Sequence, residues 1–186
     1  DRDECRRLWS EALAVFAAAA RAAGVIPTVE NYPGQASPLV TSADFLAIRQ
    51  QNPALFLTFD NGNAAGGEDP AASCRRCLPW IRHVHLKDWI RFDTAGPGRT
   101  PMLDGKFYRS ALVGEGDIDP MPVVRLLDEA GYTGYANIEY ESDDIPAPEA
   151  MRRALAWLRS QSARATGTAT PQIAGARAVP HADFTL

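Results

Sequence analysis

The sequence predicts an α/β fold that is built on a parallel sheet. Short apolar, β-prone runs alternate with helical patterns along the chain, which is the order that right-handed strand-helix-strand crossovers require. The runs are apolar enough for a sheet that is covered on both faces. Of the 186 residues, 46% are hydrophobic and 23% are charged, an ordinary globular composition that can supply one sizeable core.

The elements follow one another in a regular order. Apolar side chains recur at near-helical spacing over residues 3–23, and Gly24 ends this first helix. Strands are expected at 25–30, 55–60, 81–87 and 135–139, and further helices at 41–51, 68–78, 119–131 and 148–160. A long Gly- and Pro-rich loop is expected over 88–117. Residues 161–186 are rich in Thr, Ala, Gly and Pro, which predicts an extended or disordered tail.

Charge and composition argue against several classes of partner. A formal net charge of -4 is unfavourable for a nucleic-acid-binding face. No apolar run approaches the roughly 20 residues that cross a membrane. Three cysteines do not make a disulfide framework and favour a reducing compartment. We therefore expect a cytoplasmic protein that binds neither nucleic acid nor a membrane.

Cys74 and Cys77 form a C-R-R-C motif, which occurs in some zinc and redox sites. A zinc knuckle needs a second pair of ligands, and the third cysteine of the chain is the distant Cys5. A redox pair opens a helix, whereas Asp69-Pro70 opens this one. We interpret the motif as two helical cysteines that lie one turn apart.

A residue suited to metal binding or acid–base chemistry lies at or near the end of each predicted strand. In strand order these residues are Glu30, Asp60, His85 and Glu139. In parallel α/β folds the active site lies at the carboxyl ends of the strands. The four side chains converge only if the strands curl around a common axis, as in a barrel. Carboxylates with one imidazole suit Mn²⁺, Co²⁺, Zn²⁺ or Mg²⁺ better than a thiolate-binding ion.

The third strand continues with the stretch H-V-H-L-K-D, residues 83–88. His83, His85 and Lys87 share one face because side chains alternate along a strand. His83 could hold a ligand or contact substrate, with a structural role as the alternative. Lys87 could meet a phosphate or carboxylate of the substrate, with a plain salt bridge as the alternative. Asp88 is expected to cap the following loop or to support Lys87.

Five segments resemble, in this order, the sugar phosphate isomerase/epimerase family of the xylose isomerase-like TIM barrel superfamily: V-E-N-Y-P-G, F-D-N-G-N, H-V-H-L-K-D, V-G-E-G-D-I-D and A-G-Y-T-G-Y-A-N-I-E-Y-E. The resemblance covers about residues 1–160. It implies a (β/α)₈ barrel whose last four strands each give one ligand to a divalent metal ion, with Mn²⁺ as the first choice. The implied ligands are Glu30, Asp60, His85 and Glu139.

Because only four strand-helix units are present, we expect residues 1–160 to form the C-terminal half of such a barrel. An N-terminal half-barrel or a second copy of the chain is the expected partner, since a lone half-barrel exposes two sheet edges. Residues 161–186 are expected to follow as a separate tail.

The resemblance also implies an activity. In epimerases of this family the first and last glutamates, here Glu30 and Glu139, move a proton beside the sugar carbonyl while the metal polarises that carbonyl. Arg91, six residues beyond the metal histidine, corresponds to a substrate contact, and Asn63 replaces a histidine that contacts substrate or a second metal. We therefore expect an isomerase or epimerase that acts on a sugar or sugar phosphate.

Two alternatives remain open on the same fold. One is a metal-dependent lyase or dehydratase of the inosose dehydratase or C-glycoside-cleaving type, and the other is a non-catalytic barrel subunit. The sequence also departs from two branches of the superfamily. Tyr108 and Ser110 stand where the endonuclease branch has metal ligands, and Ala36 stands where the ketose epimerases have a substrate-contacting glutamate. The substrate is therefore not expected to be handled as in those epimerases.

Overall fold

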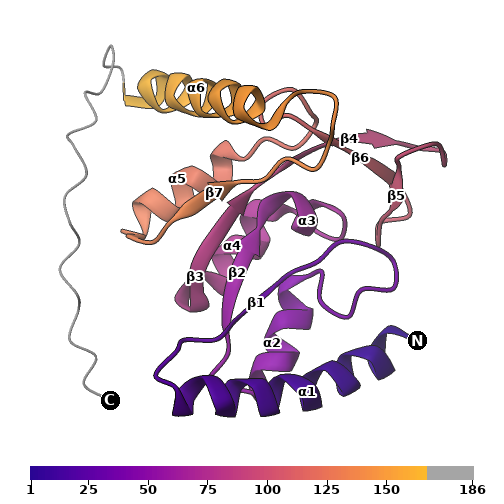
Figure 1. Ribbon diagram of the computed structural model, residues 1–186, viewed down its shortest axis with the longest axis vertical. Coiled ribbons are helices and arrows are strands. Elements are labelled where there is room, and N and C mark those ends of the chain that lie inside the picture. Colours follow the sequence, from indigo (N-terminus) through magenta and orange to yellow (C-terminus); the bar gives the residue numbers. More distant parts are fainter. Residues whose placement is uncertain (167–186) are drawn as a thin grey trace.

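A computed structural model describes residues 1–166 of the chain, and the described part is an α/β fold with a parallel sheet (Figure 1). Its helices and strands, in chain order, are α1 (Arg2–Ala22), β1 (Thr28–Glu30), α2 (Ser42–Gln51), β2 (Phe56–Asp60), α3 (Asn61–Ala65), α4 (Pro70–Cys77), a 3₁₀ turn (Leu78–Trp80), β3 (Ile81–Leu86), β4 (Asp88–Phe92), β5 (Thr100–Pro101), β6 (Phe107–Ala111), α5 (Met121–Glu129), β7 (Ala136–Ile138) and α6 (Ala147–Thr166).

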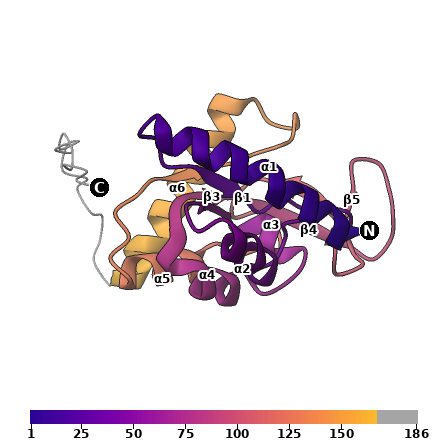
Figure 2. The same ribbon diagram turned by 90° about the horizontal axis from the view of Figure 1, so that it is seen from below.

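The main sheet has the order β1-β2-β3-β7, and all of its neighbouring strands are parallel. The register places Asp60 opposite His85, and His85 opposite Asn137. Helices contact one another along the outside of the sheet, α1 with α2, α2 with α4, and α4 with α5 (Figure 2). The predicted α/β class and parallel sheet are confirmed, and the arrangement is that of part of a barrel wall.

The two faces of the main sheet differ in polarity. The core below the helices contains the side chains of one face, which are Val29, Leu57, Phe59, Val84 and Leu86. Because side chains alternate along a strand, the opposite face carries Thr28, Glu30, Thr58, Asp60, His83 and His85. The sheet was expected to be covered by apolar side chains on both faces, and among the described residues this is so only on the face that packs against the helices.

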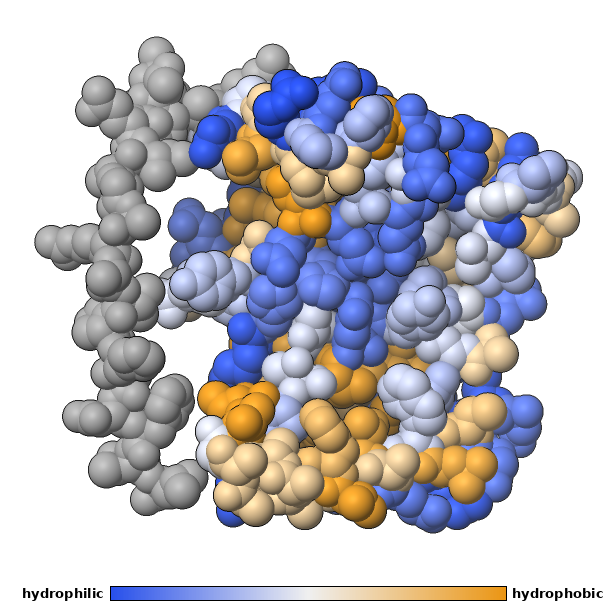
Figure 3. Space-filling view, viewed as in Figure 1, coloured by the Kyte–Doolittle hydropathy of each residue, from blue (hydrophilic) through white to orange (hydrophobic). Residues whose placement is uncertain are grey.

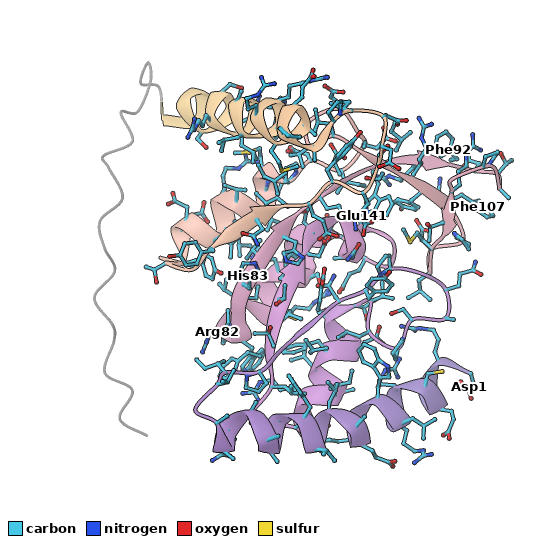
Figure 4. All side chains as sticks on the ribbon, in the orientation of Figure 1. Asp1, Arg82, His83, Phe92, Phe107 and Glu141 are labelled. Atoms are coloured by element: carbon cyan, nitrogen blue, oxygen red, sulfur yellow. The ribbon has the colours of Figure 1, made fainter. Side chains whose placement is uncertain are left out.

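The segment predicted as a loop over 88–117 contains a second, antiparallel sheet with the order β4-β6-β5. Its longest pairing runs from Asp88 opposite Ala111 to Phe92 opposite Phe107. Figure 4 shows Phe92 and Phe107 at the far end of this sheet, beyond the main sheet. The runs D-W-I-R-F and F-Y-R-S-A are β-prone, and the Gly and Pro residues that suggested a loop lie between them. The prediction of a continuous loop was wrong for this reason.

Helix boundaries follow local capping signals. Thr41 caps α2 in a capping box with Asp44, and the side chain of Asp69 caps α4 at its first residue, Pro70. α6 continues to Thr166, so residues 161–166 are helical rather than extended. The remainder of the expected tail, 167–186, lies outside the described residues.

The surface is hydrophilic over the middle of the molecule, and apolar residues gather at its lower left and centre, over part of α1 (Figure 3). Large apolar side chains of α1 are exposed, among them Leu8, Val15 and Phe16. Within the described residues, no helix is both long and apolar enough to cross a membrane.

Candidate metal centre

Four side chains meet at the carboxyl end of the main sheet, one from each strand or from the residue after it. Each of Glu30, Asp60, His85 and Glu139 offers one ligand atom, and these atoms all lie within 4.8 Å of one another. β1 ends at Glu30 and β2 at Asp60, while Glu139 directly follows β7. The convergence expected from the strand ends is therefore present, because parallel strands bring their carboxyl ends to one edge.

His85 lies at the middle of the cluster. Its Nδ1 atom is 2.9 Å from Glu30 Oε1, 2.9 Å from Glu139 Oε2 and 4.0 Å from Asp60 Oδ2. The Nδ1–H group therefore donates to carboxylates that reach it from β1 and from the end of β7. The hydrogen bonds with Glu139 and Glu30 raise the pKa of His85 to about 10. A cation bound among these oxygens would take the place of that proton.

The carboxylates have different environments. Burial is the largest influence on Asp60 and raises its pKa, and the negative charges of Glu139 and Glu30 raise it further, while Lys87 opposes them. The hydrogen bond with His85 is the largest influence on Glu139 and lowers its pKa. Three carboxylates thus share a small space, and their mutual repulsion is relieved by any cation placed between them.

Asp60 provides a test of whether the site fits a metal ion. Its Oδ1 atom accepts a hydrogen bond from the backbone N–H of Asn63 at 2.7 Å. Its Oδ2 atom is buried and has no hydrogen-bond partner among the described residues. A buried carboxylate oxygen without a partner is unfavourable unless a cation satisfies it. The donor set of three carboxylates and one imidazole can therefore hold a divalent metal ion, and it does not distinguish among Mn²⁺, Co²⁺, Zn²⁺ and Mg²⁺.

Lys87, expected as a substrate contact, is buried beside the cluster with 1% of its side chain exposed. Its Nζ atom lies 3.1 Å from Glu139 Oε1 and 2.6 Å from Glu141 Oε2. It also lies 4.7 Å from the ring centroid of Trp89, a cation–π contact. Figure 4 shows Glu141 over the carboxyl ends of the strands. The ammonium group is thus enclosed by carboxylates and an indole.

Asn63 and His83 also lie beside the cluster. Asn63 Nδ2 donates to the backbone oxygen of Asn31 at 3.0 Å and to Glu30 Oε1 at 3.4 Å. The His83 ring lies edge-on to the His85 ring, with centroids 5.2 Å apart, on the same face of β3. Burial, together with the neighbouring His85, lowers the pKa of His83. A substrate contact by either residue stays a prediction.

Arg91 lies apart from the cluster. Its backbone N–H donates to Asp117 Oδ2 at 2.8 Å, and Arg91 lines a separate hollow together with Asp104 and Asp117. Its expected contact with substrate stays a prediction. Asp88 accepts hydrogen bonds from the backbone N–H groups of Gly114, Gly116 and Ile118, so its expected role in holding the following loop is confirmed.

Three residues of the site had no role in the sequence analysis. Asn31 and Asn61 each directly follow a candidate ligand and bond to the backbone of the next strand, and Glu141 pairs with Lys87. Their position directly after Glu30 and Asp60 is the signal that could have identified the two asparagines.

The C-R-R-C cysteines lie elsewhere, in the core between the helices and the sheet. Both thiols are fully buried, and burial raises the pKa of each to about 12. Thiolates are therefore strongly disfavoured here, in agreement with the interpretation of the pair as two packed helical residues.

The fold and the cluster together define a class of protein, α/β barrel proteins with a candidate divalent-metal site at the carboxyl ends of the strands. Residues 1–161 match the family described as "Xylose isomerase-like TIM barrel". The chain belongs to the xylose isomerase-like TIM barrel family.

This chain matches only part of the length of its relatives of known name or structure. An inosose dehydratase of Klebsiella pneumoniae is 42% identical over 97 residues, which is 48% of this chain and 32% of that protein. The structure of an Escherichia coli 3-keto-D-glucoside 4-epimerase has a TM-score of 0.63 and 22% identity, covering 86% of this chain and 55% of that one. A Mycobacterium smegmatis family member solved with magnesium has a TM-score of 0.61 and 23% identity, covering 86% and 52%. The chain thus spans about a third to a half of these proteins.

Proposed function

We propose that this chain carries the metal centre of an enzyme that transfers a proton beside the carbonyl group of a sugar-like substrate. The proposal rests on one observation above all: Glu30, Asp60, His85 and Glu139 present their ligand atoms within 4.8 Å of one another at the carboxyl end of the sheet. A bound divalent cation would polarise a carbonyl oxygen and so acidify the neighbouring C–H group. Mn²⁺ is the first candidate, with Co²⁺, Zn²⁺ and Mg²⁺ as alternatives.

Glu30 and Glu139 are the proposed acid–base pair. Glu30 ends β1 and Glu139 directly follows β7, the two outer strands of the described sheet, and each carboxylate lies 2.9 Å from His85 Nδ1. Both are partly exposed, with 32% and 27% of the side chain accessible, whereas Asp60 has none. A carboxylate that takes a proton from a substrate must be accessible to it. Glu30 and Glu139 therefore suit proton transfer, and Asp60 suits metal binding alone.

Two outcomes of this first step are proposed, and each is supported by a separate observation. Similarity in sequence to inosose dehydratases favours removal of a hydroxyl group after the proton, which is a lyase reaction on an inosose-like ketone. Two carboxylates on different strands favour removal of the proton by one and return by the other, which is an epimerase or isomerase reaction. The initial proton abstraction is common to both.

One experiment separates the outcomes. The longest natural form of the protein is incubated with Mn²⁺ in D₂O, with an inosose and with a panel of ketoses, and the products are followed by NMR and mass spectrometry. Loss of water from the inosose indicates the lyase, and deuterium beside the carbonyl with inversion indicates the epimerase. Glu139→Gln should abolish either reaction. If wild type shows neither water loss nor exchange on any substrate, the proposal is wrong.

A further inference from the structure

Beyond the ligands themselves, we propose that Asn31, Asn61 and Lys87 are positioning residues that hold the four candidate ligands in register before a cation binds. We name these three residues the ligand relay. The inference rests on the proposed metal centre, and it concerns how that centre is held together rather than what reaction it performs.

Asn31 makes the first link, between β1 and β2. It directly follows Glu30 and is 3% exposed. Its Nδ2 group donates to the backbone oxygen of Asp60 at 2.8 Å, and its Oδ1 atom accepts from the backbone N–H of Asp60 at 2.9 Å. The last backbone pair of these strands is Glu30 with Thr58. The Asn31 side chain therefore supplies hydrogen bonds to Asp60 beyond the point where the backbone pairing ends. These two bonds fix the backbone of Asp60 relative to Asn31, the residue that follows Glu30.

Asn61 repeats the arrangement one strand further along. It directly follows Asp60 and is fully buried. Its Nδ2 group donates to the backbone oxygen of Lys87 at 3.0 Å, and its Oδ1 atom accepts from the backbone N–H of Lys87 at 2.8 Å. The end of β2 is thereby fixed to the end of β3, two residues beyond His85.

Lys87 makes the third link, between β3 and the residue after β7. Its Nζ atom donates to Glu139 Oε1 at 3.1 Å, while Glu139 Oε2 faces His85. One oxygen of this ligand is therefore held by the relay, and the other is directed into the cluster. The links run in strand order, from the residue after Glu30 to Asp60, from the residue after Asp60 to Lys87, and from Lys87 to Glu139.

Such a relay has a physical purpose, because three carboxylates close together repel one another until a divalent cation binds between them. Hydrogen bonds that fix the backbones and one oxygen reduce the reorganisation that cation binding requires. Partners of metal ligands commonly contribute about 10- to 100-fold to metal affinity, which sets the size of the expected effect.

The test compares Asn31→Leu and Asn61→Leu with a control, Asn52→Leu. Asn52 is also a buried asparagine, 5% exposed, whose Nδ2 group donates to Ser10 and to the backbone oxygen of Ile48 at the end of α2. Each of the three changes replaces a buried side-chain amide with an uncharged side chain of similar size. Binding of Co²⁺ alone is measured by calorimetry, its visible absorption spectrum reports the ligand geometry, and thermal unfolding reports stability.

We expect Asn31→Leu and Asn61→Leu to bind Co²⁺ about 10- to 100-fold more weakly and with an altered spectrum. Asn52→Leu should lose thermal stability but keep the wild-type affinity and spectrum. If a leucine variant does not fold, the corresponding serine variant, which is too short to reach both backbone groups, should give the same loss.

Two results would contradict the inference, and they are distinguishable. Wild-type affinity and spectrum in both relay variants would show that the relay has no positioning role, while the metal centre stands. No Co²⁺ binding by the wild-type protein would overturn the metal centre itself and the relay with it.

Discussion

Among the described residues, two groups of side chains of the types that bind metal ions can be compared, and they differ in nearly every physical respect. Cys74 and Cys77 are three residues apart in sequence, buried among apolar side chains, with their pKa values raised to about 12. Glu30, Asp60, His85 and Glu139 are spread over 110 positions and meet within 4.8 Å. The difference teaches that proximity in sequence is a weak guide to a site. What matters is a set of charged groups that are held together and remain partly accessible.

The largest effect is expected where the cluster loses its buried ligand. Asp60→Asn removes the charge and places an amide where the unpaired Oδ2 atom lies. We expect affinity for Mn²⁺ to fall by more than about 100-fold, beyond the loss typical of residues that only support a ligand. Calorimetry measures it. The matched control is Asp104→Asn, an acidic residue outside the cluster, and an equal loss in that variant would contradict the prediction.

Packing around the ligands should matter next. A Cβ atom on Gly62 would lie 2.8 Å from Trp89 Nε1 and 2.9 Å from Lys87 Cβ, and both side chains are buried. Gly62→Ala should therefore lower the free energy of unfolding by about 1–3 kcal/mol, and it should weaken Mn²⁺ binding by displacing Lys87. Urea unfolding and calorimetry test the two effects.

Gly96→Ala is the control for that change. A Cβ atom on Gly96 would meet only the flexible side chain of Arg99, at 2.9 Å, in the loop between β4 and β5. Neither stability nor metal affinity should change appreciably. If Gly62→Ala behaved like Gly96→Ala, the close packing beside Lys87 would have no influence on the site.

Asp44 is a buried carboxylate outside both groups, and its electrostatics are the reverse of those of Asp60. Burial would raise its pKa, but hydrogen bonds from the backbone N–H groups of Thr41 and Val40 and the contact with Arg2 lower it overall. Arg6 adds a second ion pair at 2.6 Å. We expect Asp44→Asn to cost about 1.5–3 kcal/mol at neutral pH, as is typical for charged hydrogen bonds.

The pH dependence of this loss has a defined sign. Because the folded-state pKa of Asp44 lies below the unfolded value of about 3.9, its contribution is complete above that value and is lost as the pH falls through the folded-state pKa. The stability difference between wild type and Asp44→Asn should therefore shrink in acid. Urea unfolding from neutral to acidic pH measures it, and a difference that grew in acid would exclude this account.

The smallest effect on metal binding is expected from the cysteines. Cys74→Ser places a hydroxyl group in an apolar core and should lower the free energy of unfolding by about 1–3 kcal/mol. Mn²⁺ affinity should be unchanged. Cys5→Ser, at an exposed position of α1, should change neither quantity. Weaker metal binding in a folded Cys74→Ser protein would mean that the two groups are coupled after all.

Several features of the structure could not be predicted from the sequence, and the physical reasons can be identified. No helix was predicted over Asn61–Ala65, where α3 begins directly after β2 because the Asp60 side chain caps it through the N–H of Asn63. The small sheet of β4, β5 and β6 was not predicted because Gly and Pro residues lie between its strands, which pair with one another and, within the described residues, not with the main sheet. The burial of Lys87 was also unforeseen, since its partners Glu139 and Glu141 lie more than fifty positions away.

The sequence by itself determined the alternation of strands and helices, the parallel order of the main sheet and the four polar strand ends. The helices and strands could be predicted because periodicity and capping depend on neighbouring residues, and their alternation along the chain then implies parallel strands. Only the tertiary structure decided which of the polar residues meet, which atom of each carboxylate is free, and that two asparagines and a lysine join the strand ends. Those properties depend on the spacing and register of strands that are distant in sequence. The hydrogen-bond partners of a side chain can be identified only when the positions of those strands are known.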